Sequence, residues 1–250
     1  MTVGVAVRAR DGIVLASDSL TTFGRGAPVA RHTNKVYVIN HKDLEHPVAL
    51  AGAGMTAFID KFVDRANRTG IEAARKNPKV DRTLDVVDFV EHVCEPLVAI
   101  LMKEYLIDRN RFFGSQMSEY SLGMLVAGAT KDKEMRAYTI HEDGLSEFIS
   151  GYGTIGSGAA YAELFLHGFV PEPSKTSIND AVRLVSYAIK GVEIMDPNVG
   201  GDTKVCVLKF EKDKLVVKEL KNSDLPRHAK EKMEAVLSKI GKDMRSLVGR

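Results

Sequence analysis

The sequence has no tryptophan and only two cysteines among its 250 residues. Cys94 and Cys206 stand far apart in apolar surroundings, which favours buried free thiols over a disulfide framework. No cysteines and histidines are spaced like the ligands of a metal site, so we expect no bound metal. Unpaired thiols are usual in a reducing compartment, and they indicate a cytoplasmic protein.

Strong charge of one sign and long hydrophobic runs are also missing. The formal net charge is +2, which gives no electrostatic case for binding nucleic acid or an anionic membrane surface. No apolar run approaches the roughly 20 residues that a membrane-spanning helix needs. Charged residues interrupt the N-terminal segment, so we expect no secretory leader. These absences leave local motifs as the guide to function.

The first 17 residues contain a β-hairpin pattern. "VGVAVRA" and "DGIVLASDS" are both rich in β-branched and apolar residues, and the Asp11-Gly12 pair between them is a strong turn signal. The pattern predicts paired strands over 3–8 and 13–17. Two further strands are expected over 35–39 and 47–52.

Apolar spacings of three and four residues then predict two helices, over 55–76 and 84–107. Asp81 or Thr83 is a plausible N-cap of the second helix, and Pro96 is expected to kink it. Strand patterns return and alternate with two more helical patterns later in the chain. The expected strands are 121–130, 134–141, 145–150, 203–210 and 215–220, and the expected helices are 158–168 and 177–195.

Runs of strands and runs of helices that are segregated along a chain indicate the α+β class. Because the strands are apolar on both sides, we expect two mainly antiparallel sheets packed face to face between two helical layers. This four-layer αββα sandwich would occupy residues 1–220. Residues 221–250 form a helical extension with an apolar stripe, which packs either on its own domain or on a neighbouring subunit; the stripe is Met233, Leu237, Ile240, Met244 and Leu247.

Thr2 is the first candidate for chemistry. A threonine at a free N-terminus carries a hydroxyl nucleophile and, beside it, an α-amine that can act as its base. The α-amine titrates near 7.7–8.0, so a useful fraction is neutral at physiological pH. Removal of Met1 is the processing step that such chemistry requires here. Without that removal, the Thr2 nitrogen is an amide and has no basic character.

Asp18 and Lys35 are the next candidates, because one follows a predicted strand and the other opens one. A buried lysine, held charged by an aspartate, would place a fixed positive potential beside the Thr2 hydroxyl. That potential would favour the alkoxide and keep the amine unprotonated. Taken singly, Asp18 could equally be a turn residue and Lys35 a cation at the start of a strand.

The order of these motifs resembles a known family. "TVGVAVRARDGIVLASDS", "NKVYVI" and "ALAGAG" are similar to the start of a proteasome β-type subunit and of its bacterial relatives, the HslV and Anbu proteases. "GSG" before a helix and "D…GG" before the closing strands extend the resemblance to about residue 210. These proteins are N-terminal nucleophile (Ntn) hydrolases, so the resemblance implies the same αββα fold.

The resemblance also implies roles for particular residues. Thr2 would be the nucleophile, tuned by Lys35, which Asp18 orients. The backbone N–H of Gly52 would form the oxyanion hole, although Gly54 competes for that role and a helix-entry turn also explains Gly52. Two further residues would contact or support the threonine amine, and four would line the substrate pocket. The amine contacts are Ser157 and Asp196, and the pocket residues are Thr21, Thr33, Leu50 and Gly54.

The chain departs from the family pattern at several positions. The spacing from Thr2 to Lys35 is one residue longer than usual, and Val199 stands where active β-subunits commonly have a second serine. By comparison with the family pattern we expect no long N-terminal extension and no propeptide, so that only Met1 would mask Thr2.

The resemblance implies a threonine peptidase that assembles into rings of its own subunits and cleaves polypeptides without a metal or organic cofactor. An ATP-dependent unfoldase is a possible partner by the same resemblance. Two alternatives stay open. One is a small-amide hydrolase or transpeptidase of the same superfamily, and the other is a catalytically silent ring subunit that keeps Met1.

Overall fold

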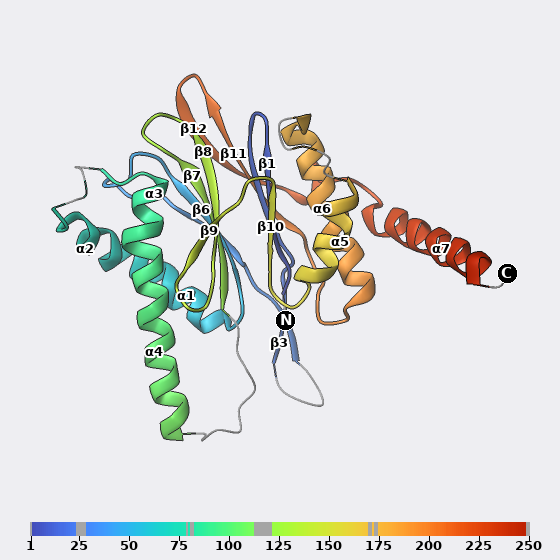
Figure 1. Ribbon diagram of the computed structural model, residues 1–250, viewed down its shortest axis with the longest axis horizontal. Helices are drawn as coiled ribbons and strands as arrows, with labels where there is room; N and C mark the ends of the chain where they lie inside the picture. The colour runs from blue at the N-terminus through green and yellow to red at the C-terminus, as the bar shows by residue number, and fades with distance from the viewer. Residues whose placement is uncertain are drawn as a thin grey trace.

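The protein consists of two antiparallel sheets that lie face to face, with helices on both outer sides (Figure 1). This architecture is that of a computed structural model of the 250-residue chain. The described residues are 2–23, 29–78, 80, 83–112, 122–169, 172 and 175–248.

The first sheet has five strands in the order β10-β1-β2-β11-β12. Its central hairpin pairs β1 with β2 and sets Gly4 opposite Ser17. β11 then joins the other edge of β2, so β1 and β2 are covered on both edges and both faces. The strands are β1 (Gly4–Ala9), β2 (Gly12–Ser17), β10 (Tyr152–Ile155), β11 (Lys204–Glu211) and β12 (Lys214–Leu220).

The second sheet has the order β5-β6-β7-β8-β9, and a separate two-stranded ribbon, β3-β4, stands apart from both sheets. The ribbon projects beside the N-terminus of the chain (Figure 1). The strands are β3 (Leu20–Phe23), β4 (Val29–His32), β5 (Val36–Ile39), β6 (Val48–Ala53), β7 (Gly123–Ala129), β8 (Met135–Ile140) and β9 (Ser146–Phe148).

Helices cover the outer face of each sheet. Four α-helices, joined by the π-helical turns 66–70 and 90–94, pack on the second sheet, and α5 and α6 pack on the first. The helices on the second sheet are α1 (Thr56–Arg65), α2 (Ile71–Arg75), α3 (Val86–Phe89) and α4 (Glu95–Phe112). Those on the first are α5 (Ala159–Phe169) and α6 (Ile178–Met195), and the C-terminal α7 (Ala229–Val248) packs on α6.

Three apolar cores separate the four layers, and they follow from the two-residue period of the strands. In β6, Leu50 faces the helices α1 and α4, whereas Ala49 and Ala51 face the other sheet. Cys94 and Cys206 are buried and unpaired, as the sequence indicates. Burial raises the pKa of the Cys206 thiol to about 12, so it is protonated and unreactive. The predicted αββα sandwich is confirmed.

The first hairpin is confirmed, but its turn lies one residue earlier than predicted. Ala9 pairs with Gly12, so the two turn residues are Arg10 and Asp11. Gly12 lies in the strand because a Cβ there would meet the Leu208 carbonyl oxygen at 2.2 Å. Glycine at this position therefore allows β11 to approach β2 closely. The carboxylate of the neighbouring Asp11 accepts a hydrogen bond from the Ile178 amide at the start of α6 (2.9 Å).

The predicted cap of the second helix is also corrected. Asp85 is the N-cap, and its carboxylate accepts hydrogen bonds from the Val87 and Asp88 amides, with Asp88 completing a capping box. Thr83 lies two residues too early, and Asp81 lies outside the described residues. Pro96 falls in the first turn of α4, directly after the π-helical turn 90–94, and the predicted kink at Pro96 stays a prediction.

Three strands were not predicted, namely β3, β4 and β10. β10 follows β9 after only three residues. The sequence pattern around residues 145–150 therefore predicts a single strand, whereas the chain forms two. The ribbon strands pair only with each other and lack the apolar run of a buried sheet. Both features lie next to Thr2, as described below.

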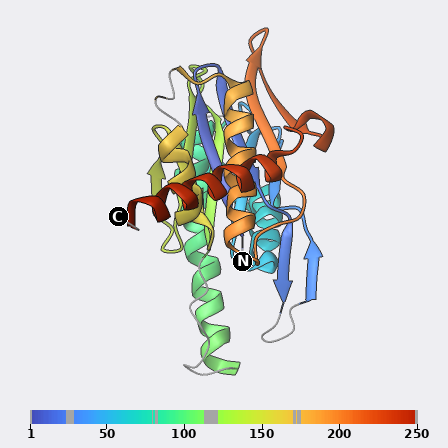
Figure 2. The same ribbon diagram turned by 90° about the vertical axis from the view of Figure 1, so that its right-hand side faces the viewer.

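Helix α7 packs across the outer face of α6 (Figure 2). Met233 is buried against this face and Leu237 is half-buried. The side chains of Ile240, Met244 and Leu247 lie outside those described. The division at residue 220 stays a prediction.

The outer core of the second sheet gives a stability prediction. Phe62 on α1 is fully buried between the helices and β6, so Phe62→Ala should lower the free energy of unfolding by about 3–5 kcal/mol. Leu164→Ala on α5 is the control, because that side chain is 67% exposed and its loss should change stability by about 0.5 kcal/mol at most. Urea unfolding followed by circular dichroism measures both. Equal losses in the two variants would contradict the assignment of this core.

Candidate active site

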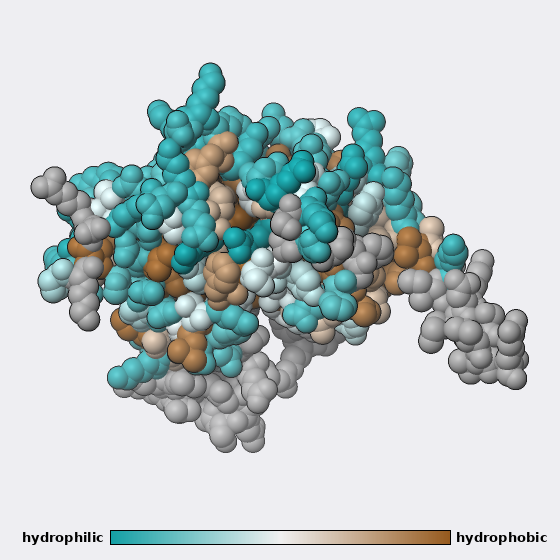
Figure 3. All heavy atoms as spheres, turned by 45° about the horizontal axis from the view of Figure 1, so that its top comes forward, coloured by the Kyte–Doolittle hydropathy of each residue, from teal (hydrophilic) through white to brown (hydrophobic). Residues whose placement is uncertain are grey.

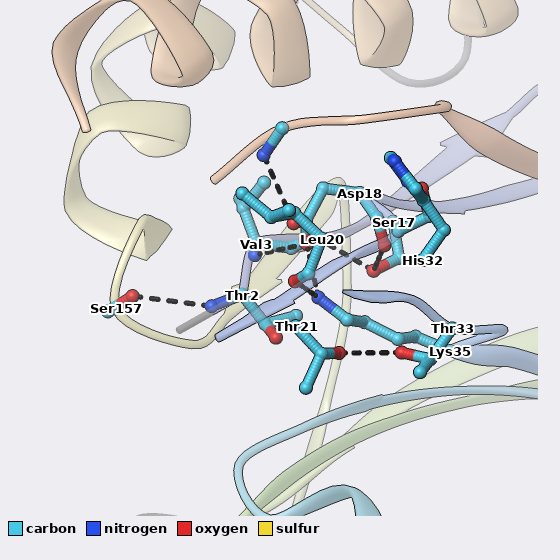
Figure 4. Close-up of polar contacts among 12 residues, drawn as sticks. Thr2, Val3, Ser17, Asp18, Leu20, Thr21, His32, Thr33, Lys35 and Ser157 are labelled. Atoms are coloured by element: carbon cyan, nitrogen blue, oxygen red, sulfur yellow. Dashed lines mark hydrogen bonds and ion pairs between the residues drawn. The ribbon is translucent and has the colours of Figure 1, made fainter. Parts of the chain in front are cut away.

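Thr2 lies just before β1, where the first sheet meets the loop that leads into α5. It is almost completely buried, with 4% of its surface exposed. Its backbone N–H donates to Ser157 Oγ at 3.4 Å, and its carbonyl accepts from the Gly158 amide at 3.2 Å. Figure 4 shows Thr2 between Ser157 on one side and the pair of Lys35 and Asp18 on the other.

Asp18 directly follows β2 and is fully buried. Its carboxylate accepts three hydrogen bonds: Oδ1 from the Val3 amide and from Lys35 Nζ, both at 3.0 Å, and Oδ2 from the Gly200 amide at 3.2 Å. These donors come from three separate segments of the chain. Asp18 therefore fixes the backbone next to Thr2 against the start of β5 and the loop after α6.

Lys35 precedes β5, the edge strand of the second sheet, and is 2% exposed. Its ammonium donates to Asp18 Oδ1 at 3.0 Å and also to the Leu20 carbonyl. A cation from one sheet is thus paired with an anion from the other, at the end of the molecule where Thr2 lies (Figure 4).

Burial shifts the pKa values of both partners toward neutrality. Desolvation raises the pKa of the Asp18 carboxyl above its usual value, against the opposing effects of Lys35 and of the Val3 and Gly200 amides. Desolvation likewise lowers the pKa of the Lys35 ammonium, against the opposing charge of Asp18. Each charge therefore stabilises the other, and losing either would shift the pKa of its partner further in the direction of the neutral form.

Gly52 and Gly54 differ in what their backbone amides do. The Gly52 amide already donates to the Lys35 carbonyl at 3.0 Å, in line with the β5–β6 ladder. A Cβ at Gly52 would meet the Ile59 side chain at 2.7 Å, so the packing of α1 requires glycine there. Gly54 lies beyond the end of β6, is exposed, and has a φ of 118°. Within the described residues its amide donates to no carbonyl, which leaves it available to a ligand.

Gly156 is a site residue that the sequence analysis did not single out. Its φ is +90°, and a Cβ there would meet the Thr2 carbonyl oxygen at 2.2 Å and the Ala53 Cβ at 3.1 Å. The "GSG" turn thus packs directly on Thr2 and on the end of β6, and only glycine fits. The "GSG" motif is visible in the sequence, but the motif alone does not show that its first glycine packs on Thr2.

Asp196 is the C-cap residue of α6, and its carboxylate accepts hydrogen bonds from the backbone and side-chain amides of Asn198, at 2.9 and 3.1 Å. Its expected support of Ser157 and of the Thr2 amine stays a prediction. Val199 is buried in the core between the first sheet and its helices. Because the residue is a valine, this position provides no hydroxyl.

Two of the proposed pocket residues meet beside Thr2, and one does not. Thr21 on β3 and Thr33 after β4 share a hydrogen bond of 2.6 Å between their hydroxyls, at the base of the ribbon (Figure 4). Leu50 has no exposed surface and packs under the helices on the second sheet. That Leu50 lines a substrate pocket stays a prediction.

The fold and this site define a class of protein. Two face-to-face antiparallel sheets between helical layers, with a threonine at the head of a central strand, make up the Ntn-hydrolase fold. The family model for proteasome subunits matches residues 2–208, and the chain belongs to that family.

Individual relatives agree with this assignment. The chain is 26% identical over 191 residues to the proteasome subunit beta of Nanoarchaeum equitans (strain Kin4-M), a match that covers 76% of this chain and 84% of the relative. Its fold resembles that of an Anbu (Gly-1) mutant from Hyphomicrobium sp. strain MC1, with a TM-score of 0.70, 16% identity and coverage of 98% and 97% of the two chains. The helical assembly of the Anbu complex from Pseudomonas aeruginosa gives a TM-score of 0.71 at 15% identity, covering 98% of this chain and 96% of that one.

No described helix is long and apolar enough to cross a membrane. No group of three or more histidine, cysteine, aspartate or glutamate side chains in the described ranges is arranged to hold a metal ion.

The buried pair generates a stability prediction with a pH dependence. Lys35→Met leaves Asp18 without its cation, and removing one partner of a buried ion pair costs about 3–5 kcal/mol. The pKa of Asp18 in the folded variant should then rise further above its value in the unfolded chain. The folded state binds the proton more tightly, so the free energy of unfolding should decrease as pH rises between the two pKa values.

Urea unfolding of Lys35→Met and wild type across the range from about pH 5 to about pH 8 tests this. The double variant Asp18→Asn, Lys35→Met is the control, because it removes both charges. It should recover part of the stability that Lys35→Met loses, and its stability should not show the added pH dependence. A Lys35→Met variant with the same pH dependence as wild type would contradict the pairing.

Proposed function

We propose that this protein is a threonine peptidase that becomes active when Met1 is removed and Thr2 becomes the N-terminal residue. The single observation that carries the proposal is the buried Lys35–Asp18 pair beside Thr2. A buried ion pair contributes little to stability compared with apolar residues of the same volume. Its presence next to a potential nucleophile is therefore better explained by chemistry than by stability.

The arrangement around the Thr2 nitrogen supports the same proposal. In the unprocessed chain this nitrogen is an amide within hydrogen-bonding distance of Ser157 Oγ. Removal of Met1 turns it into an α-amine at the same place, where Ser157 can orient it. The amine then acts as the base that accepts the proton of the Thr2 hydroxyl.

The reaction follows from these positions. The Thr2 oxygen attacks the carbonyl carbon of a peptide bond, and the positive charge of Lys35 stabilises the developing alkoxide. The C–N bond then breaks, the leaving amine takes up the proton, and the acyl group stays on Thr2 as an ester. Water, deprotonated by the Thr2 amine, hydrolyses the ester and restores the hydroxyl.

The oxyanion of the tetrahedral intermediate needs a backbone donor. The Gly54 amide fits this role better than the Gly52 amide, because the latter is already donated to the Lys35 carbonyl. The hydroxyls of Thr21 and Thr33 and the edge of the β3–β4 ribbon would contact the substrate backbone. No metal takes part in the proposed steps.

We also propose that the protein assembles with copies of itself. One structural relative is the helical assembly of the Anbu complex from Pseudomonas aeruginosa. In this chain a groove of about 370 Å³ lies between α5, α6 and α7, and hydrophobic surface is visible where α7 leaves the body of the molecule (Figure 3). The apolar residues that line this groove are Phe165, Leu166, Leu184, Tyr187, Met233 and Val236.

Covalent labelling tests the nucleophile. A ubiquitin fusion whose cleavage leaves Thr2 as the first residue separates the chemistry from Met1 processing. With a peptide epoxyketone, the freed chain should gain one adduct that maps to Thr2 by peptide mass spectrometry. Thr2→Ala, prepared from the same fusion, should gain none, because it keeps the amine but lacks the hydroxyl.

The activity itself is tested with unfolded casein, whose fragments should appear with wild type and not with Thr2→Ala. An adduct without casein cleavage would instead support a small-amide hydrolase. A free N-terminal Thr2 that forms no adduct would overturn the proposal in favour of a silent subunit.

Self-assembly is tested by sedimentation. Wild type should sediment as a multimer, and Val236→Asp, which places a charge in the apolar groove, should shift the protein to smaller species. Glu234→Gln on the same helix is the control, because that exposed side chain does not line the groove, and it should sediment like wild type. A monomeric wild type, or equal behaviour of the two variants, would contradict a role for this groove in assembly.

A further inference from the structure

The loop 196–203, which joins α6 to β11, supplies one of the three donors to Asp18. The Gly200 amide donates to Asp18 Oδ2 at 3.2 Å, and the Gly200 carbonyl accepts from the Leu20 amide at 2.9 Å and the Ser19 amide at 3.2 Å. The Leu20 carbonyl in turn accepts a hydrogen bond from Lys35 Nζ. The position of this loop therefore sets both the environment of Asp18 and the backbone that contacts Lys35.

A lysine on α6 anchors the same loop from its other side. Lys190 Nζ donates to the Gly201 carbonyl at 2.8 Å and to Glu193 Oε2 at 2.6 Å. Glu193 also accepts from Lys230 of α7, at 3.0 Å. Lys190 and Glu193 are mostly buried, with 21% and 17% of their side-chain surfaces exposed.

The charges of this cluster are held by their partners. Burial opposes ionisation of Glu193, but the hydrogen bonds from Lys190 and Lys230 lower the pKa of its carboxyl below the usual value. Glu193 is therefore an anion that holds the Lys190 ammonium in place. Ion pairs with this degree of burial and with several partners are more persistent than isolated surface pairs.

The loop has little freedom to take another path. Gly201 has a φ of +78°, and a Cβ there would meet the His32 ring at 2.6 Å and Ser19 Oγ at 2.7 Å. A Cβ at Gly200 would meet Glu193 Cγ at 3.4 Å. The loop thus lies between the ribbon and the end of α6, so a change on the α6 side is transmitted to the Gly200 contact with Asp18.

We propose that Lys190, held by Glu193, is a positioning residue for the Asp18–Lys35 pair. It fixes the Gly201 carbonyl, which keeps the Gly200 amide on Asp18 and the Gly200 carbonyl on the Leu20 amide. The catalytic part of this inference rests on the proposed function. Lys230 links the start of α7 to the same cluster, so the docking of α7 contributes to the position of the loop.

The test compares Lys190→Met with Lys190→Arg. The methionine variant keeps most of the aliphatic stem and loses the ammonium, whereas arginine can still donate to both the Gly201 carbonyl and Glu193. Lys175→Met is the matched control, because Lys175 forms an i,i+3 pair with Glu172 that is exposed and distant in sequence from the loop.

Two readouts separate the inference from the proposed function. The first is amide hydrogen exchange of residues 19, 20 and 200 in the full chain, which requires no activity. Lys190→Met should accelerate exchange at these amides by about 3–10-fold, the effect of weakening one hydrogen-bonded anchor, while Lys190→Arg and Lys175→Met should match wild type.

The second readout is the inactivation of chains with a free Thr2 by the epoxyketone. The maximal inactivation rate of Lys190→Met should fall by about 3–10-fold while the inhibitor concentration for half-maximal rate stays unchanged, because Lys190 contacts none of the candidate substrate residues. Lys190→Arg should restore the rate.

The outcomes are distinct. Unchanged exchange in Lys190→Met overturns the inference whatever the activity. Faster exchange with an unchanged inactivation rate shows a structural anchor only and overturns the positioning role. A wild type that is not inactivated at all overturns the proposed function, and the exchange data then decide alone whether Lys190 holds Gly200 on Asp18.

Discussion

The structure around Thr2 depends on the buried carboxylate of Asp18. A buried anion without partners costs several kcal/mol, and here three donors from distant segments offset that cost. One donor is the Val3 amide, next to the nucleophile candidate, and another is Lys35, which begins the second sheet. Asp18 therefore fixes the alignment of the two sheets at this end of the sandwich, and with it the place of Thr2.

Because Asp18 depends on these donors, the ion pair of Asp18 and Lys35 is sensitive to the loss of any of them. Desolvation raises the pKa of Asp18 and lowers that of Lys35, and each donor to Asp18 opposes this shift. Replacing the pair with apolar side chains would cost little stability. The loop after α6 takes part in holding the pair, because its Gly200 amide completes the set of donors to Asp18.

Sequence reasoning reached the features that local patterns encode. The β1–β2 hairpin, the helices and the αββα order follow from apolar periods, and the motif order placed Thr2, Asp18 and Lys35 together. The strands β3, β4 and β10 have only four residues each and are too short to show such a period, although Ile155 of β10 is buried between the sheets. The Gly200 contact and the Lys190 anchor join residues far apart in the chain. No local pattern could have revealed them, because backbone groups carry no sequence signal and the sequence alone does not distinguish Lys190 from a lysine on the surface.

The two glycines at the end of β6 illustrate how structure changes a role that a motif assigns. In "ALAGAG" the glycine that matches the family motif is Gly52. The nearby Ile59 side chain leaves no room for a Cβ at this position, and the Gly52 amide already donates a hydrogen bond to the Lys35 carbonyl. Strand pairing uses up backbone donors until the strand ends, so the first amide open to a substrate comes after Ala53. Gly54 meets this condition, because its φ of 118° turns the chain out of the ladder. The end of the β5–β6 pairing is therefore the physical reason for which we propose Gly54, rather than the glycine of the motif, as the oxyanion donor.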